Sequence, residues 1–132
     1  MTYFDQTLEC APREQIESRQ GRLFLSLMEK LENKNLFYTE KLNRAGLSFG
    51  DIQSLEDLQK VPFTTKSELM EAQEQSPPFG TNLTFPESAY TRFHQTSGTT
   101  GVPLRVLDTE ESWKWWGPVS YTHLRAHETL TD

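Results

Sequence analysis

The chain has 132 residues, 35% of them hydrophobic, and a formal net charge of -6. That length suits one domain or part of a larger one. The negative charge argues against a protein that coats nucleic acid. Cys10 is the only cysteine, which rules out an internal disulfide and a cysteine-built metal site. With no secretory signal and no apolar run of membrane-spanning length, the sequence predicts a cytoplasmic protein without nucleic-acid or membrane partners.

The first half of the chain has the pattern of helices. Residues 1–11 show no clear period and are predicted to be a loose leader. From Pro12, which suits a first helical turn, apolar residues recur at helical spacing as far as Leu31, and the helix is expected to end within residues 33–35. A second helix is predicted from Leu36 to Ala45, with Gly46 as its left-handed stop.

Two shorter helices and a loop follow. Ser54 is expected to cap a helix at residues 55–60. Thr65 and Glu68 form the sequence pattern of a capping box, which predicts a helix over residues 66–75. The proline-rich stretch 77–86 is then expected to be a long loop.

The last part of the sequence changes to strand character. Residues 90–95 alternate in the manner of a strand, and residues 104–107 resume one after a run of small residues. Thr109 is expected to cap a final helix, in which Trp113, Trp115 and Trp116 pack into the core. The two strands have no visible sheet partners, so their edges are expected to be exposed.

The run of small residues between the strands carries the chemistry of a phosphate site. Glycines let backbone N–H groups approach phosphate oxygens closely, and short hydroxyls add further donors. The run matches neither the Walker pattern nor the dinucleotide fingerprint, and a Ser/Thr/Gly cluster of this kind is by itself often a solvated hairpin loop. The predicted phosphate-binding residues are Thr96, Ser97, Gly98, Thr99, Thr100 and Gly101.

The ordered string of these six residues, followed one residue later by Pro103, resembles the phosphate-binding signature of the adenylate-forming enzymes. Arg92 and His94, placed ahead of the loop, resemble the phenylacetate-CoA ligase branch of that superfamily. Residues 35–46 and 61–69 are similar to two upstream landmarks of the same branch. The resemblance runs from about residue 23 to residue 116.

This resemblance implies an α/β fold: N-terminal helices plus the first strand–phosphate-loop–strand unit of an adenylate-forming (AMP-binding) domain, incomplete. It also implies an acid–thiol ligase that uses ATP, Mg²⁺ and coenzyme A. A carboxylic acid, by default an aryl acid such as phenylacetate, becomes an acyl-adenylate and then a CoA thioester. Two alternatives stay open: an adenylating enzyme with a carrier-protein thiol or an amine as acceptor, and a non-catalytic helical interaction module.

Three residues beside the loop are candidates for support. Arg92 and His94 are expected on one face of their strand, where His94 lines a pocket or is simply structural. Many relatives carry a lysine near the end of the loop, where this chain has Val102 and Leu104. Arg105 is the nearest cation, and either screens phosphate charge or faces solvent.

The C-terminal segment does not continue the family pattern. Residues 119–129 resemble the translation of a common transposon-end sequencing adapter, and residues 119–132 are predicted to be non-native read-through. His123 and His127 within it are therefore rejected as a metal site, and no metal ligands are predicted. The predicted division is a leader at 1–11, part of an adenylating domain at 12–118 and the tail at 119–132. No catalytic residue is assigned, and the isolated chain is expected to be inactive and only marginally stable.

Overall fold

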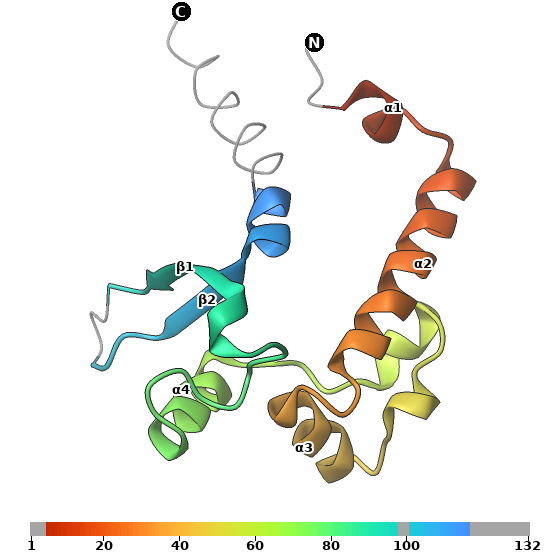
Figure 1. Cartoon of the computed structure of the whole chain (residues 1–132). Coiled ribbons are helices and arrows are strands. Elements are labelled where there is room, and N and C mark those ends of the chain that lie inside the picture. Colours follow the sequence, from red (N-terminus) through yellow and green to blue (C-terminus); the bar gives the residue numbers. More distant parts are fainter. Residues whose placement is uncertain (1–4, 98–100, 117–132) are drawn as a thin grey trace, which may run out of the picture.

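The computed structural model describes residues 5–97 and 101–116, and helices precede the two strands along the chain (Figure 1). The α-helices and strands are α1 (Gln6–Glu9), α2 (Arg13–Leu31), α3 (Leu36–Arg44), α4 (Lys66–Gln75), β1 (Tyr90–Gln95) and β2 (Arg105–Thr109). Short 3-10 turns lie at Phe49–Asp51, Glu56–Lys60 and Glu87–Ala89, and residues 110–116 are helical. Among the described residues no helix is long and apolar enough to cross a membrane.

The long helix α2 forms one side of the molecule, and the β1–β2 hairpin with α4 forms the other (Figure 1). Pro12 stands at the N-cap of α2, as its fixed backbone angle favours. Only Phe24 and Leu31 are buried on this helix, and Leu23 and Leu27 are 47% and 48% exposed. The apolar stripe predicted for α2 is thus present, but neighbouring elements cover only part of it.

The helix α3 begins at an unpredicted cap. Asn35 is its N-cap, and the side chain accepts a hydrogen bond from the Tyr38 backbone N–H at 3.0 Å. The helix ends at Arg44, one residue earlier than expected, and Gly46 adopts the predicted left-handed conformation with φ 71°. A helical turn also occupies Gln6–Glu9, so the leader is not without structure.

The capping box that begins α4 is confirmed. The Thr65 hydroxyl accepts from the Glu68 N–H at 3.3 Å, and the Glu68 carboxylate accepts from the Thr65 N–H at 2.7 Å. The preceding helix prediction was wrong in type, because residues 56–60 form a 3-10 helix. The Ser54 hydroxyl donates to the Asp57 carboxylate instead of accepting from the backbone, so it does not cap that turn.

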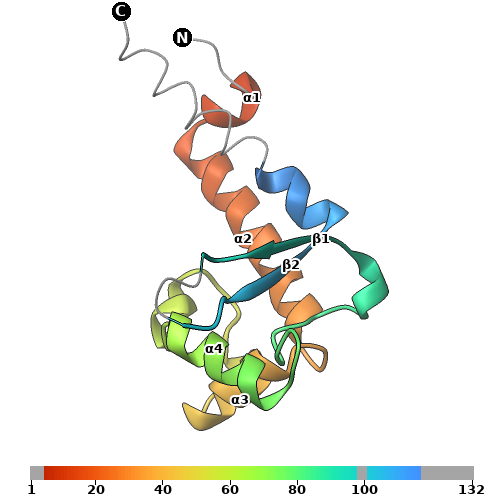
Figure 2. The ribbon, with the colours of Figure 1, turned by 90° about the vertical axis from the view of Figure 1, so that its left-hand side faces the viewer.

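The two strands form an antiparallel hairpin with an irregularity between Tyr90 and Arg92. In Figure 2, turned by 90° from Figure 1, this hairpin stands in front of α2, with α4 below it. The expectation that both strands lack partners was wrong, since they pair with each other. The buried apolar residues that hold these elements together are Phe24, Leu31, Phe37, Leu42, Ile52, Ala72 and Leu104.

Candidate functional site

The predicted phosphate loop connects β1 to β2, and Thr96 closes its base. The Thr96 N–H donates to the Leu104 carbonyl at 3.0 Å, and the Leu104 N–H donates to the Thr96 hydroxyl at 3.1 Å. A side-chain oxygen thus replaces the main-chain carbonyl in the last rung of the ladder. The hydroxyl of Thr96 is already an acceptor within the protein.

The remaining loop residues fall into two groups. Ser97 and Gly101 are exposed, and Gly101 has φ 139° with no atom within 4 Å of the position that a Cβ would take. The backbone at Gly101 is therefore open to close approach by a ligand. Gly98, Thr99 and Thr100 lie outside the described residues.

Arg105 makes side-chain and main-chain contacts with α4 and with the turn that follows it. Its guanidinium donates to the Pro78 carbonyl at 3.2 Å. Its backbone N–H donates to the Gln73 side-chain oxygen at 3.1 Å, and its carbonyl accepts from the Gln73 side-chain nitrogen at 2.6 Å. Arg105 therefore joins β2 to α4 and to the turn that follows α4.

Arg92 and His94 share a face of β1, as predicted, and both contact Trp113. The His94 ring stacks on the indole with centroids 5.0 Å apart, and the Arg92 guanidinium carbon lies 5.8 Å from the same ring centroid. His94 Nε2 is 3.4 Å from an Asp108 carboxylate oxygen, within ion-pair reach but without hydrogen-bond geometry. Through Trp113, this face of β1 packs against the helix at residues 110–116, and Arg92 and His94 make that contact.

The three tryptophans do not pack into the core, and that prediction was wrong. Trp113, Trp115 and Trp116 are 39%, 53% and 52% exposed. Arg19 of α2 lies over Trp115, with 5.8 Å from its guanidinium carbon to the ring centroid. An amphipathic pattern specifies a face that can be buried, and within the described residues that face is only partly covered.

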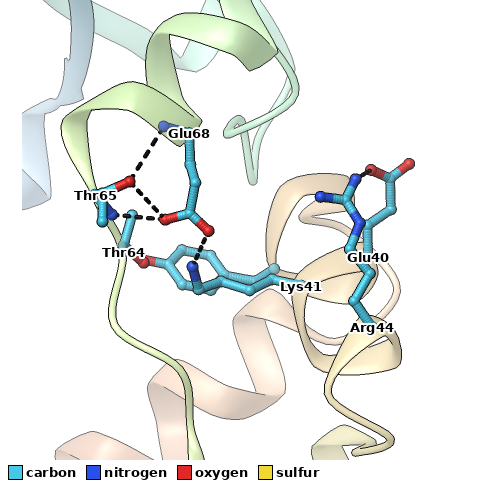
Figure 3. Close-up of polar contacts among 7 residues, drawn as sticks. Glu40, Lys41, Arg44, Thr64, Thr65 and Glu68 are labelled. Atoms are coloured by element: carbon cyan, nitrogen blue, oxygen red, sulfur yellow. Dashed lines mark hydrogen bonds and ion pairs between the residues drawn. The ribbon is translucent and has the colours of Figure 1, made fainter.

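A charged pair joins α3 to α4 away from the loop (Figure 3). Lys41 is 7% exposed, and its ammonium group donates to Glu68 Oε1 at 2.6 Å. The hydrogen bond from Lys41, followed by the bond from the Thr65 backbone N–H, lowers the pKa of Glu68 to about 2 from a usual 4.5. The Arg44–Glu40 pair on α3 is separate and exposed. These contacts explain helix packing and offer no free group to a ligand.

No metal ligands are predicted from the sequence, and His123 and His127 are rejected as a metal site. Among the described residues, no group of three or more His, Cys, Asp or Glu side chains is arranged to hold a metal ion. His123 and His127 lie outside the described residues.

Comparison with known proteins identifies sequences that are similar to this chain. No family model matches the chain. The phenylacetate-coenzyme A ligase of Thermus thermophilus is 33% identical over 119 residues, which are 90% of this chain and 26% of that protein. The corresponding ligase of Escherichia coli K12 is 33% identical over 120 residues, with the same coverage. This chain is homologous to the phenylacetate-CoA ligases. It spans about a quarter of the length of the curated relatives it matches.

Solved structures place the chain in the N-terminal part of adenylate-forming CoA ligases. A 2-hydroxyisobutyryl-CoA ligase in its thioesterification state, bound to 2-HIB-AMP and CoA, is 29% identical with a TM-score of 0.75 over 84% of this chain and 24% of that one. An open conformation of the same ligase gives 27% identity and a TM-score of 0.73. The predicted fold is confirmed: helices followed by the strand–loop–strand unit of a ligase, incomplete.

Two side chains that make tertiary contacts were not foreseen, one of them beside the loop. Gln73 binds the backbone of β2 next to the loop, and Asn35 is buried between α3 and residues 82–84. Asn35 precedes a helical run, a position that favours asparagine caps, so a capping signal existed. Gln73 contacts a residue 32 positions away, and no local pattern in the sequence indicates such a bond.

Proposed function

We propose that the loop at residues 96–101 binds the phosphates of ATP, and that the complete protein joins a carboxylic acid to coenzyme A through an acyl-adenylate. The observation that carries this proposal is the loop itself. It has the ordered signature of the adenylate-forming enzymes, it is fixed at its base by Thr96, and it lies in a chain homologous to the phenylacetate-CoA ligases.

The described loop residues fit a phosphate. Ser97 offers an exposed hydroxyl, and the open backbone at Gly101 allows close approach. Thr96 and Arg105 are engaged elsewhere, with Leu104 and with Pro78. These contacts favour recognition by loop N–H groups and the hydroxyls of Ser97, Thr99 and Thr100, with Thr96 as the anchor of the loop.

In the proposed reaction, a carboxylate oxygen attacks the α-phosphorus of ATP, and the bond to pyrophosphate breaks. The thiol of coenzyme A then attacks the acyl carbon and displaces AMP. The loop contributes donors that hold the β- and γ-phosphates and stabilise the charge on the departing group. Mg²⁺ belongs to this proposal as the ion that neutralises phosphate charge. A cytoplasmic location stays a prediction from the sequence.

The acid belongs to the proposal only as a class. The curated relatives are named for phenylacetate and the solved relatives for 2-hydroxyisobutyrate. Both are small carboxylic acids, so these two are the substrates to test first. The 132-residue chain contains about a quarter of the relatives' length and is proposed to be inactive in ligation by itself.

The test has two parts. Sequencing the source gene downstream of codon 116 from an independent amplification establishes whether the reading frame continues, and the resulting product is then assayed for ATP–pyrophosphate exchange with each acid. Gly98→Val is expected to abolish exchange, because a branched side chain obstructs phosphate approach. Gly50→Val is the matched control, since a Cβ at Gly50 makes only an ordinary contact of 3.5 Å with the Ser48 hydroxyl oxygen. Exchange that survives in Gly98→Val would refute the phosphate role, and a wild-type product without exchange would refute adenylation.

A further inference from the structure

At Arg105, the edge of β2 that faces away from β1 is bonded by the side chain of Gln73. Gln95 and Arg105 are opposite each other in the hairpin, and the main-chain groups of Arg105 bond to Gln73 of α4 instead of to β1. This fits the alternation of an antiparallel ladder, in which every second residue directs its N–H and C=O outward. Leu104, the preceding residue, directs the same groups inward to Thr96.

The Gln73 amide takes the place that a neighbouring strand would have. Its nitrogen donates to the Arg105 carbonyl at 2.6 Å and its oxygen accepts from the Arg105 N–H at 3.1 Å. The Arg105 side chain adds a bond to Pro78, directly beyond α4. Leu104 is 8% exposed, so the point where the chain leaves the loop is also packed. Two adjacent residues are therefore fixed from opposite sides, Leu104 by Thr96 and Arg105 by Gln73.

We propose that Gln73 is a positioning residue of the loop between β1 and β2: its amide fixes the loop's exit against α4, while Thr96 fixes the same exit against β1. This rests on the proposed function only for the identity of the ligand. A loop that must present N–H groups to phosphate needs defined ends, because misplaced donors lose affinity. The Gln73 amide is bonded to Arg105 and has no hydrogen bond to Ser97 or Gly101, so we expect its effect on them to pass through Leu104 and Arg105.

The competing explanation is that Gln73 merely covers a strand edge. The two roles differ in what they do to the loop. Edge cover predicts a change at Arg105 alone, whereas positioning predicts altered backbone conformation at Ser97 and Gly101, on both sides of the loop. A spectroscopic signal from those two amides therefore separates the explanations.

The experiment compares Gln73→Met with Gln75→Met in the 132-residue chain by amide NMR and hydrogen exchange. Both changes remove a side-chain amide from α4, but the Gln75 amide donates only to Glu71 of the same helix. In Gln73→Met we expect the Arg105 amide to exchange about tenfold faster and the Ser97 and Gly101 resonances to shift. Gln75→Met should leave all three as in wild type. The Glu68 amide, which donates to Thr65, reports whether α4 stays folded.

A second variant guards against loss of folding. Gln73→Glu keeps the acceptor for the Arg105 N–H and loses the donor to its carbonyl, so the Arg105 amide should stay more protected than in Gln73→Met. Ser97 and Gly101 resonances that match wild type in both Gln73 variants would overturn the proposal.

Titration of the 132-residue chain with MgATP distinguishes the positioning role of Gln73 from the proposed phosphate binding by the loop. If the wild-type chain binds, Gln73→Met should weaken binding about threefold or more, and unchanged affinity would overturn the positioning role. If neither wild type nor Gln75→Met responds to MgATP, phosphate binding by this chain fails. Shifts at Ser97 and Gly101 in Gln73→Met would then still support Gln73 as the residue that positions the loop.

Discussion

Removing the Asn35 side chain should destabilise the chain more than any single exposed substitution. Asn35 is 2% exposed and makes three side-chain hydrogen bonds. Its oxygen accepts from the Tyr38 N–H at 3.0 Å, and its nitrogen donates to Asn82 Oδ1 and Thr84 Oγ1, both at 3.0 Å. One side chain therefore caps α3 and ties that helix to the loop ahead of β1.

The magnitude follows from these three bonds. Loss of an N-cap costs about 1 kcal/mol. Each bond from the buried Asn35 nitrogen to the two loop acceptors contributes about 1 kcal/mol, the usual net value of an intramolecular hydrogen bond. Asn35→Ala should thus lower the free energy of unfolding by about 3 kcal/mol. Asn35→Ser keeps a capping oxygen, and should recover about 1 kcal/mol of that loss.

Urea unfolding followed by far-ultraviolet circular dichroism measures the effect. Asn43→Ala is the matched control: it makes the same change in the same helix, where Asn43 is exposed, and should alter the unfolding free energy by less than about 0.5 kcal/mol. Equal unfolding free energies for Asn35→Ala and Asn43→Ala would refute the tertiary role. A serine variant as unstable as the alanine variant would refute the separate capping contribution.

Four further outcomes follow from local geometry, all measurable by the same urea titration. Because folding lowers the pKa of Glu68 to about 2, the ionised carboxylate stabilises the fold fully above about pH 4.5, and this stabilisation is lost as the pH falls toward 2. Glu68→Gln should therefore flatten the dependence of the unfolding free energy on pH. An unchanged pH profile in this variant would contradict the assignment to Glu68. Gly21→Ala should stabilise α2 by about 0.5–1 kcal/mol, as nothing lies within 4 Å of the new Cβ. Gly46→Ala should cost about 1 kcal/mol because φ is 71°, so a gain there would count against the left-handed stop. Gly80→Ala should cost about 2 kcal/mol, since φ is 79° and the Cβ would lie 3.1 Å from the Ala72 backbone; a loss no larger than that at Gly46 would refute the steric part.

Features fixed by a few neighbouring residues were predictable from the sequence. The Thr65–Glu68 capping box and the α4 bounds of Lys66–Gln75 are confirmed, as is the strand Tyr90–Gln95. In the capping box, each partner lies within one turn of the other, so sequence spacing determines whether they meet. The left-handed Gly46 is confirmed for the same reason, since the requirement lies in one residue's backbone angle.

Features that depend on tertiary contacts were not predictable in this way. Asn35 was predicted to lie at the end of α2, although it is the N-cap of α3. Asparagine is common at both ends of helices, and its hydrogen-bond partners determine which end it caps. Gln73 has an ordinary polar position in its helix, and its partner Arg105 is known only once α4 meets β2. The three tryptophans were predicted to be buried and are exposed, because a sequence pattern does not state what covers a helix.

The loop shows how the two interpretations of its sequence relate to each other. A hairpin loop and a phosphate loop were treated as alternatives, yet the structure has an antiparallel hairpin at this position in a chain homologous to CoA ligases. Hairpin topology therefore does not count against phosphate binding. The bonds at the exit of the loop are more informative. A turn that only reverses the chain needs no more than the main-chain hydrogen bonds between its two strands, whereas this loop is also bonded by the Thr96 hydroxyl and the Gln73 amide. These anchors fix the two ends of the loop, at Thr96 and at Leu104–Arg105, and defined ends are what the proposed phosphate role requires.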